Sequence, residues 1–283
     1  MQATNLHKCI SCGNSFSGTY CNECGEKVIK KEEQKFSYFL GQIIDELAFW
    51  DTKFFKSLKL LLFKPGFLTR EFMMGRRKIY TKPISLFFIA NLLYFFFQPV
   101  DTLNSSFETQ TKGQIYSSIT MKMVNTKSKM ENISYDQLAE KYDKKSPDNS
   151  RIFVLLIVFM FSLFLSILYW GKKRYYVEHL MFSFTYISAI IYTLFFLLPI
   201  LLYLIYLALK HIFDYRLIFN INGEVISILL LSLIFLYLTI ALKTFYRQKL
   251  WITIIKGVLL TISSVIIILS YKFILFFITM LMI

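Results

Sequence analysis

The chain has 283 residues, of which 55% are hydrophobic and 18% aromatic, and its formal net charge is +14. Soluble domains are about half apolar or less, and several runs here exceed the roughly 18 apolar residues of a membrane span, so the composition excludes an ordinary soluble protein. An excess of Lys and Arg in a membrane protein is typical of its cytoplasmic flanks. We therefore consider nucleic-acid binding the weaker explanation of the charge.

The N-terminus carries all four cysteines of the chain, arranged as two Cys-x-x-Cys-Gly turns. Zinc prefers four soft ligands in a tetrahedron, and a glycine after each pair permits the positive φ of a tight turn. Two disulfides are the alternative and need an oxidising compartment, whereas a thioredoxin-like motif needs a βαβ context that is missing. The sequence predicts a zinc ribbon over residues 1–26. Its expected ligands are Cys9, Cys12, Cys21 and Cys24.

The segment between the two turns, Phe16–Tyr20, is typical of a short hairpin with aromatic flanks. So small a unit cannot bury a core of its own. We expect the metal to be structural and to supply folding free energy on the order of 10 kcal/mol.

Residues 27–82 are predicted to form a charged linker, an amphipathic interfacial helix and a basic collar. Apolar residues recur at helical spacing from Gln42 to Phe63, and lysines fall on the other side. Such a helix lies in the headgroup plane or packs on the transmembrane bundle, and both interpretations stay open. Pro65-Gly66 is expected to end it.

Basic residues crowd the segment before the first predicted span. A juxtamembrane cluster attracts anionic lipid headgroups with about 1 kcal/mol per charge. A topology signal explains the cluster better than a specific anion site does. Glu71 is the single acid there and is expected to pair with Arg70 or Arg76. The candidate lipid- or anion-binding residues are Arg70, Arg76, Arg77, Lys78 and Lys82.

The order of these motifs resembles the bacterial domain-of-unknown-function family 3667. The residues are Cys-x-x-Cys-Gly, Gly-Thr-Tyr-Cys-x-x-Cys-Gly, and Pro-Gly-x-x-x-Arg-Glu-Phe-x-x-Gly-x-Arg-x-x-Tyr-x-x-Pro, over roughly residues 9–98. Glu178-His179-Leu-x-Phe-Ser is also similar to that family. The resemblance implies a multi-span membrane protein with an N-terminal zinc ribbon, and it brings no established activity. Glu26 stands where members commonly have Gln, a position that is not a ligand.

The fold class expected is an all-α integral membrane bundle of about five spans in residues 83–283. We expect residues 99–150 to form a flexible extracytoplasmic loop, apart from one helical piece at Ser134–Lys145. Pro199 is expected to kink the third span. The predicted spans are Pro83–Gln98, Ile152–Trp170, His179–Leu209, Val225–Leu242 and one within Trp251–Ile283.

Loop charges predict the orientation. Residues 1–82 carry 14 Lys and Arg against 8 acids, whereas residues 99–150 carry seven of each. The loops at 171–178 and 243–256 are also rich in Lys and Arg. Five spans with a cytosolic N-terminus place these basic loops on one side. We therefore expect a multi-pass protein of the bacterial inner membrane.

Ionisable groups inside the membrane are functional suspects, and few are present. Lys272 snorkels at the outer surface or lies inside the last span, depending on where that span ends. Glu178 and His179 form a tentative polar site, although an interfacial acid paired with basic neighbours explains them better. No Ser-His-Asp grouping, phosphate loop or paired catalytic carboxylates is visible, so we do not predict an enzyme.

The first functional hypothesis is that the zinc ribbon and basic amphipathic segment dock an unknown protein partner or anionic lipid of the bilayer. The alternative is a small transporter or channel that the ribbon regulates. It requires polar residues from several helices to converge on a cavity. Nucleic-acid binding by the ribbon and its Lys-rich linker is the third and weakest hypothesis.

Overall fold

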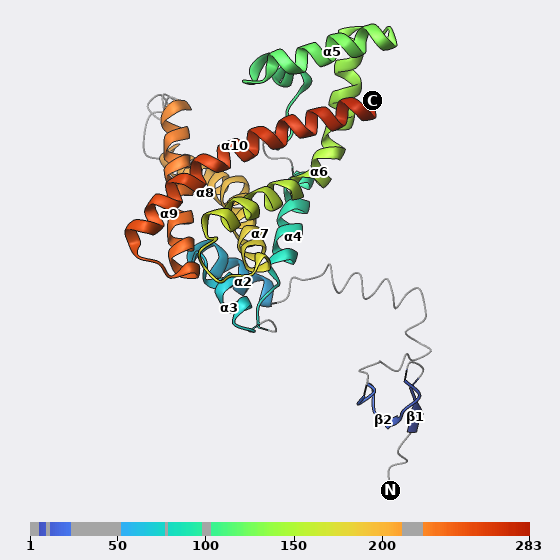
Figure 1. Cartoon of the computed structure of the whole chain (residues 1–283). Coiled ribbons are helices and arrows are strands. Elements are labelled where there is room, and N and C mark those ends of the chain that lie inside the picture. The colour runs from blue at the N-terminus through green and yellow to red at the C-terminus, as the bar shows by residue number, and fades with distance from the viewer. Residues whose placement is uncertain (1–5, 10–11, 24–51, 77–78, 98–102, 211–222) are drawn as a thin grey trace. The chain divides into compact units, whose positions relative to one another are not determined.

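Figure 1 shows the computed structural model, which describes residues 6–9, 12–23, 52–76, 79–97, 103–210 and 223–283. The chain divides into two compact units, Met1–Thr52 and Lys53–Ile283. The first holds the cysteine-rich head and the second holds the apolar helices, and each is described by itself.

The N-terminal unit contains a two-stranded antiparallel sheet. Strand β1 (Leu6–Lys8) pairs with β2 (Ser15–Ser17), and His7 lies opposite Phe16. The hairpin therefore encloses the first Cys-x-x-Cys turn and does not lie within Phe16–Tyr20, where we expected it. The difference arises because β2 pairs with the residues before the first cysteine, for which we predicted no strand.

Helix α2 (Thr52–Phe63) is the C-terminal part of the predicted amphipathic helix, whose remainder lies outside the described residues. Its buried side chains Phe54, Ser57 and Leu61 follow helical spacing. The helix ends before Pro65-Gly66, as predicted, and α3 (Phe67–Met73) follows.

The apolar face of α2 packs on the transmembrane helices. The ring of Phe54 lies 6.5 Å from that of Tyr192, and the hydroxyl of Tyr237 donates to the Leu61 carbonyl at 2.5 Å. Phe55 and Phe63 are exposed. Both interpretations of the helix are thus compatible with the structure, because one face is packed and two exposed aromatic rings remain for the interface.

The larger unit is a helical bundle with four helices long and apolar enough to cross a membrane among the described residues. They are α6 (Tyr135–Leu168), α7 continuing through a π-helical turn η3 (Thr193–Leu197) into α8 (Leu198–Lys210), α9 (Gly223–Tyr246) and α10 (Leu250–Met282). Helix α7 itself covers Tyr176–Tyr192.

The first predicted span is the apolar helix α4 (Pro83–Phe97), which is shorter than the other four. Fifteen residues extend about 22 Å, less than the roughly 30 Å of a hydrocarbon core. The membrane-helix class is therefore confirmed, and the fifth crossing stays a prediction.

The third predicted span contains a π-helical turn close to the proline at which the sequence suggested a kink, and the kink itself stays a prediction. The π-helical turn η3 ends two residues before Pro199. Proline has no N–H to donate, and its ring collides with the carbonyl four residues earlier. The chain passes through this wider turn and continues as α8.

Residues 103–134 contain helices where we expected an irregular polar loop. A π-helical turn η2 (Thr109–Gly113) leads into α5 (Ser117–Glu131). The predicted helical piece at Ser134–Lys145 is the start of α6, and Ser134 caps it with Gln137 in a capping box. The expectation of an unstructured cap is wrong for these residues.

These helices acquire a core because α10 lies against them. Phe276 is fully buried, with its ring 6.2 Å from Phe107 and 5.4 Å from Tyr142. Burial raises the pKa of the Tyr116 phenol, which stays protonated and donates to Oε1 of Gln110 at 2.7 Å. A polar sequence thus folds on an apolar helix that is distant in the chain.

Lys272 lies beside this polar segment. Nε2 of Gln110, in η2, donates to the Lys272 carbonyl at 3.3 Å, and the hydroxyl of Tyr271 reaches the Ser150 carbonyl at 3.5 Å. Ser150 precedes the apolar part of α6. These contacts favour the snorkelling interpretation, in which the lysine marks the end of the last span.

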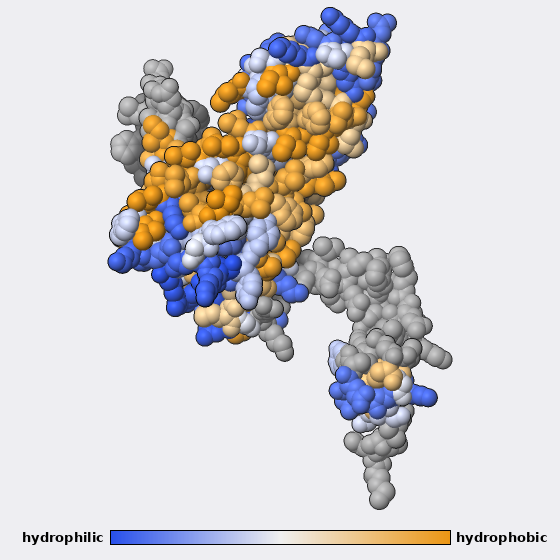
Figure 2. Space-filling model, viewed as in Figure 1, coloured by the Kyte–Doolittle hydropathy of each residue, from blue (hydrophilic) through white to orange (hydrophobic). Residues whose placement is uncertain are grey.

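On the face shown in Figure 2, hydrophobic surface covers the middle of the helical unit. Hydrophilic surface gathers at its two ends, over α5 and around the loops near α3. This distribution is typical of a membrane bundle.

Candidate metal centre and basic end of the bundle

Three cysteine thiols converge in the N-terminal unit. The Sγ atoms of Cys9, Cys12 and Cys21 all lie within 4.8 Å of one another. The Sγ atoms of Cys12 and Cys21 are 3.6 Å apart, far beyond the roughly 2.05 Å of a disulfide. Four sulfurs at 2.3 Å from one zinc are about 3.8 Å apart along each tetrahedral edge. The observed spacing fits ligands of a shared ion.

The backbone around the first pair forms a tight turn. The N–H of Cys9 donates to the Asn14 carbonyl at 2.8 Å, and the N–H of Gly13 donates to the Cys9 carbonyl at 3.0 Å. Gly13 has a φ of 76°, which only glycine adopts freely. Phe16 packs on Cys9 and Cys21 as the small core of this unit.

The fourth predicted ligand, Cys24, lies outside the described residues. A tetrahedral zinc site needs a fourth donor in addition to these three thiols. When bound, the metal supplies a crosslink between the two turns, in a unit whose apolar core is very small.

Glu71 is the buried acid of the larger unit's basic segment. Its side chain is 1% exposed and pairs with Nη2 of Arg70 at 3.2 Å and with Nη1 of Arg76 at 2.5 Å. The predicted pairing is confirmed with both arginines. Gly75, with a φ of 92°, turns the chain so that Arg76 reaches back to Glu71.

The remaining residues of the predicted collar are placed differently. Lys82 is exposed at the start of α4. Arg77 and Lys78 lie outside the described residues. Whether any of the five collar residues binds lipid stays a prediction.

Glu178 and His179 lie at the start of α7, where both are buried. Glu178 pairs with Arg174 and accepts the N–H of Tyr175 at 3.2 Å. Nδ1 of His179 lies 2.6 Å from the hydroxyl of Tyr246 on α9. The structure brings both residues into interhelical contacts, and the expected pairing of the acid with a basic neighbour is confirmed.

A family model described as "Protein of unknown function (DUF3667)" matches residues 51–95. The resemblance to that family is confirmed. The DUF3667 match covers α2, α3 and most of α4, together with the Glu71 ion pairs, and the cysteine head lies outside it. No curated protein and no solved structure matches the chain. The description of the family names no activity. The match therefore identifies a structural segment that the chain shares with the family and no function.

The DUF3667 segment docks through a close backbone contact. A Cβ on Gly66 would lie 2.4 Å from the Ala241 carbonyl oxygen of α9. Its φ of 76° also requires glycine. The Pro-Gly of the motif therefore lets α3 approach α9.

This docking gathers the basic loops at one end of the bundle, which we call the basic end. Arg174 lies over the Phe245 ring at 5.0 Å, which joins the α6–α7 loop to α9. The basic residues of the basic end come from α3, the α6–α7 loop, and the α9–α10 turn with its flanks. They are Arg70, Arg76, Lys172, Lys173, Arg174, Lys243, Arg247, Lys249 and Lys256.

An aromatic stack that we did not predict lies at this end. The rings of Tyr169 and Tyr246 lie 3.7 Å apart and 15° from parallel. Nζ of Lys256 lies 3.8 Å from the Tyr169 ring centroid and donates to the Leu168 carbonyl at 2.8 Å. The sequence does show tyrosines at the ends of its apolar runs. It does not show which of these tyrosines pair across helices.

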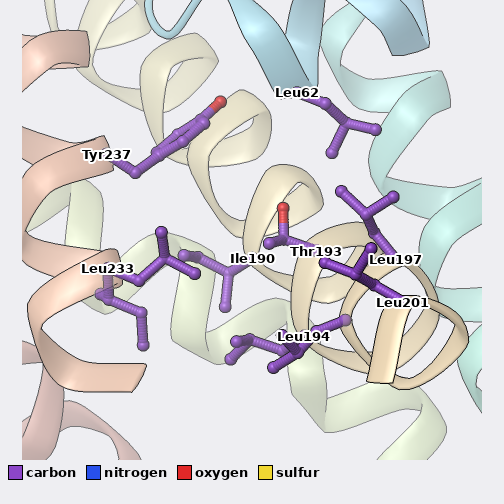
Figure 3. A pocket seen from close by; sticks show the side chains of 10 residues that line it. Leu62, Ile190, Thr193, Leu194, Leu197, Leu201, Leu233 and Tyr237 are labelled. Carbon is purple, nitrogen blue, oxygen red and sulfur yellow. The ribbon is translucent and has the colours of Figure 1, made fainter. Parts of the chain in front are cut away.

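A cavity of about 220 Å³ lies between α7–η3–α8 and α9, with α2 along one side. Figure 3 shows its lining side chains, which come from these elements. The lining is aliphatic except for Thr193 and Tyr237. A transporter path needs converging polar groups, and this cavity has few.

Proposed function

We propose that the chain is a membrane-anchored docking protein with a zinc ribbon at its head. In this proposal Cys9, Cys12, Cys21 and Cys24 hold one structural zinc, and the folded head presents a surface to a protein partner. The observation that carries the proposal is the convergence of three thiols within 4.8 Å.

The basic end supplies the membrane side of the same proposal. Its basic loops lie together, and Glu71 and Glu178 are each neutralised by arginine. A surface with this excess of positive charge attracts anionic headgroups. By the charge rule for loops it faces the cytosol, which fits the reducing compartment that thiolate ligands require. We propose the bacterial inner membrane as the location.

The transporter alternative has less to support it. The cavity described between the spans is lined mostly by Leu and Ile. At the basic end the buried side chain of His179 is engaged with Tyr246. Neither arrangement forms a polar path.

The docking proposal is tested by crosslinking the full-length protein in cells that express it at native level. The Cys9→Ser/Cys12→Ser double variant is compared with a Ser15→Ala/Ser17→Ala control, which alters the same hairpin and leaves the thiols intact. We expect specific crosslinked partners of the parent chain and the control to be lost in the cysteine variant. An unchanged set of partners in all three chains would contradict a docking role for the ribbon.

A further inference from the structure

The cavity of Figure 3 is not explained by docking at the head or at the basic end. Its volume of about 220 Å³ is several times the roughly 30 Å³ that one water molecule occupies in the liquid. The hydroxyl of Tyr237 already donates to the Leu61 carbonyl. Apolar cavities of this kind stay dry. Hydrocarbon is therefore the chemistry that the lining selects.

The cavity lies beside the π-helical turn η3. Near the basic end α7 and α9 are in contact, and the rings of Phe182 and Phe245 lie 5.5 Å apart. Further along, the π-helical turn η3 precedes Pro199. The lining side chains of η3 and α8 then face those of α9 across open space (Figure 3).

The cavity communicates with the surface of the bundle. Leu201 is 50% exposed and Leu233 is 42% exposed, and both line it. They belong to helices apolar enough to cross a membrane. The medium at their exposed side is then the acyl chains of the bilayer, which makes a lipid tail the occupant with direct access.

Helix α2 carries a positive charge next to the cavity. Leu62, at the edge of the packed face of α2, lines the cavity, and Lys59 neighbours Leu62 one turn earlier on the exposed face of the helix. The Lys59 side chain is exposed. A headgroup phosphate next to Lys59 leaves its acyl chain directed towards Leu62 and the aliphatic lining.

We propose that this cavity binds one acyl chain of an anionic phospholipid, with Lys59 beside the phosphate. The site is distinct from the ribbon and from the basic end, and it does not depend on the docking proposal. Lipid annuli contact every membrane helix, whereas this site holds one chain between α8, α9 and the DUF3667 segment.

The test uses the full-length protein in phosphatidylcholine vesicles that contain phosphatidylglycerol with a diazirine on its acyl chain. After illumination, crosslinked peptides are mapped by mass spectrometry. We expect crosslinks concentrated on residues 190–201 and 233–237. Leu194→Trp, which fills the cavity, should lower that yield about tenfold, equivalent to about 1.4 kcal/mol. Leu236→Trp, on the exposed face of α9, should leave it unchanged.

Leu201→Trp at the mouth provides a second filling variant if Leu194→Trp does not fold. The headgroup is tested by Lys59→Gln, which should lower the yield with phosphatidylglycerol about fivefold and leave a phosphatidylcholine probe unaffected. Lys122→Gln on α5 removes the same charge at a distance from the cavity. Crosslinks spread evenly over all lipid-facing peptides, unchanged yields in both filling variants, or equal effects of the two lysine changes would overturn the proposal.

Discussion

The hydroxyl of Tyr246 on α9 lies 2.6 Å from Nδ1 of His179 on α7. Both side chains are buried, so one polar contact joins two apolar helices at the basic end. The Tyr246 ring also stacks on Tyr169 of the α6–α7 connection. The end of α6 and the start of α7, which are neighbours in the sequence, therefore both meet α9 at one tyrosine.

Tyr246→Phe keeps the stacked ring and removes the hydroxyl that meets His179. The imidazole loses a buried hydrogen-bond partner, and we expect a destabilisation of about 1 kcal/mol. Reversible unfolding of the full-length protein in mild detergent measures it. Tyr203→Phe is the control, because Tyr203 is 60% exposed. Equal stability of the two variants would show that the His179 contact contributes nothing.

Glu71→Gln removes the charge that holds Arg70 and Arg76. Glu71 is buried, and both arginines keep some solvent contact, so we expect a loss of about 2 kcal/mol. Glu108→Gln breaks an exposed pair with Lys112 and should cost less than about 0.5 kcal/mol. Similar unfolding free energies for the two variants would remove Glu71 from any structural role in the DUF3667 segment.

Gly66→Ala and Gly75→Ala separate backbone strain from collision. Both positions have positive φ, but only Gly66 faces another helix, at 2.4 Å from the Ala241 carbonyl oxygen. Each alanine costs about 1 kcal/mol for its conformation, and Gly66→Ala adds about 1–3 kcal/mol for the collision. Thermal unfolding midpoints should rank Gly66→Ala well below Gly75→Ala. The reverse order contradicts the docking of α3 on α9.

Phe276→Ala tests whether α10 supplies the core of the α5 region. Phe276 is fully buried against Phe107 and Tyr142, whereas its neighbour Phe277 is 43% exposed. We expect Phe276→Ala to cost about 3–5 kcal/mol and to speed amide hydrogen exchange in residues 103–134. Phe277→Ala should have a much smaller effect. Unchanged exchange in the Phe276 variant would mean that these helices are stable without α10.

The sequence predicted what depends on local pattern. Apolar runs identified the helices that are long enough to span, and the π-helical turn within the third predicted span lies just before Pro199. The single acid among many bases predicted that Glu71 pairs with arginine. Each of these results requires only composition, spacing or nearby charge.

Contacts between residues far apart in the chain could not be predicted from the sequence. The polar segment before α6 folds because Phe276, more than a hundred residues later, fills its core. Strand β2 pairs with residues before the first cysteine, which carry no strand signal of their own. The contact of His179 with Tyr246 depends on the arrangement of α7 and α9. None of these partners is specified by local periodicity.

The metal content of the purified full-length protein tests the central proposal most directly. Protein is purified under reducing conditions without chelator, and bound metal per chain is measured by elemental mass spectrometry beside the Cys9→Ser/Cys12→Ser variant. We predict one zinc per chain for the parent protein and none for the variant. A parent chain without stoichiometric metal, or with its cysteines joined as disulfides, would contradict the zinc ribbon.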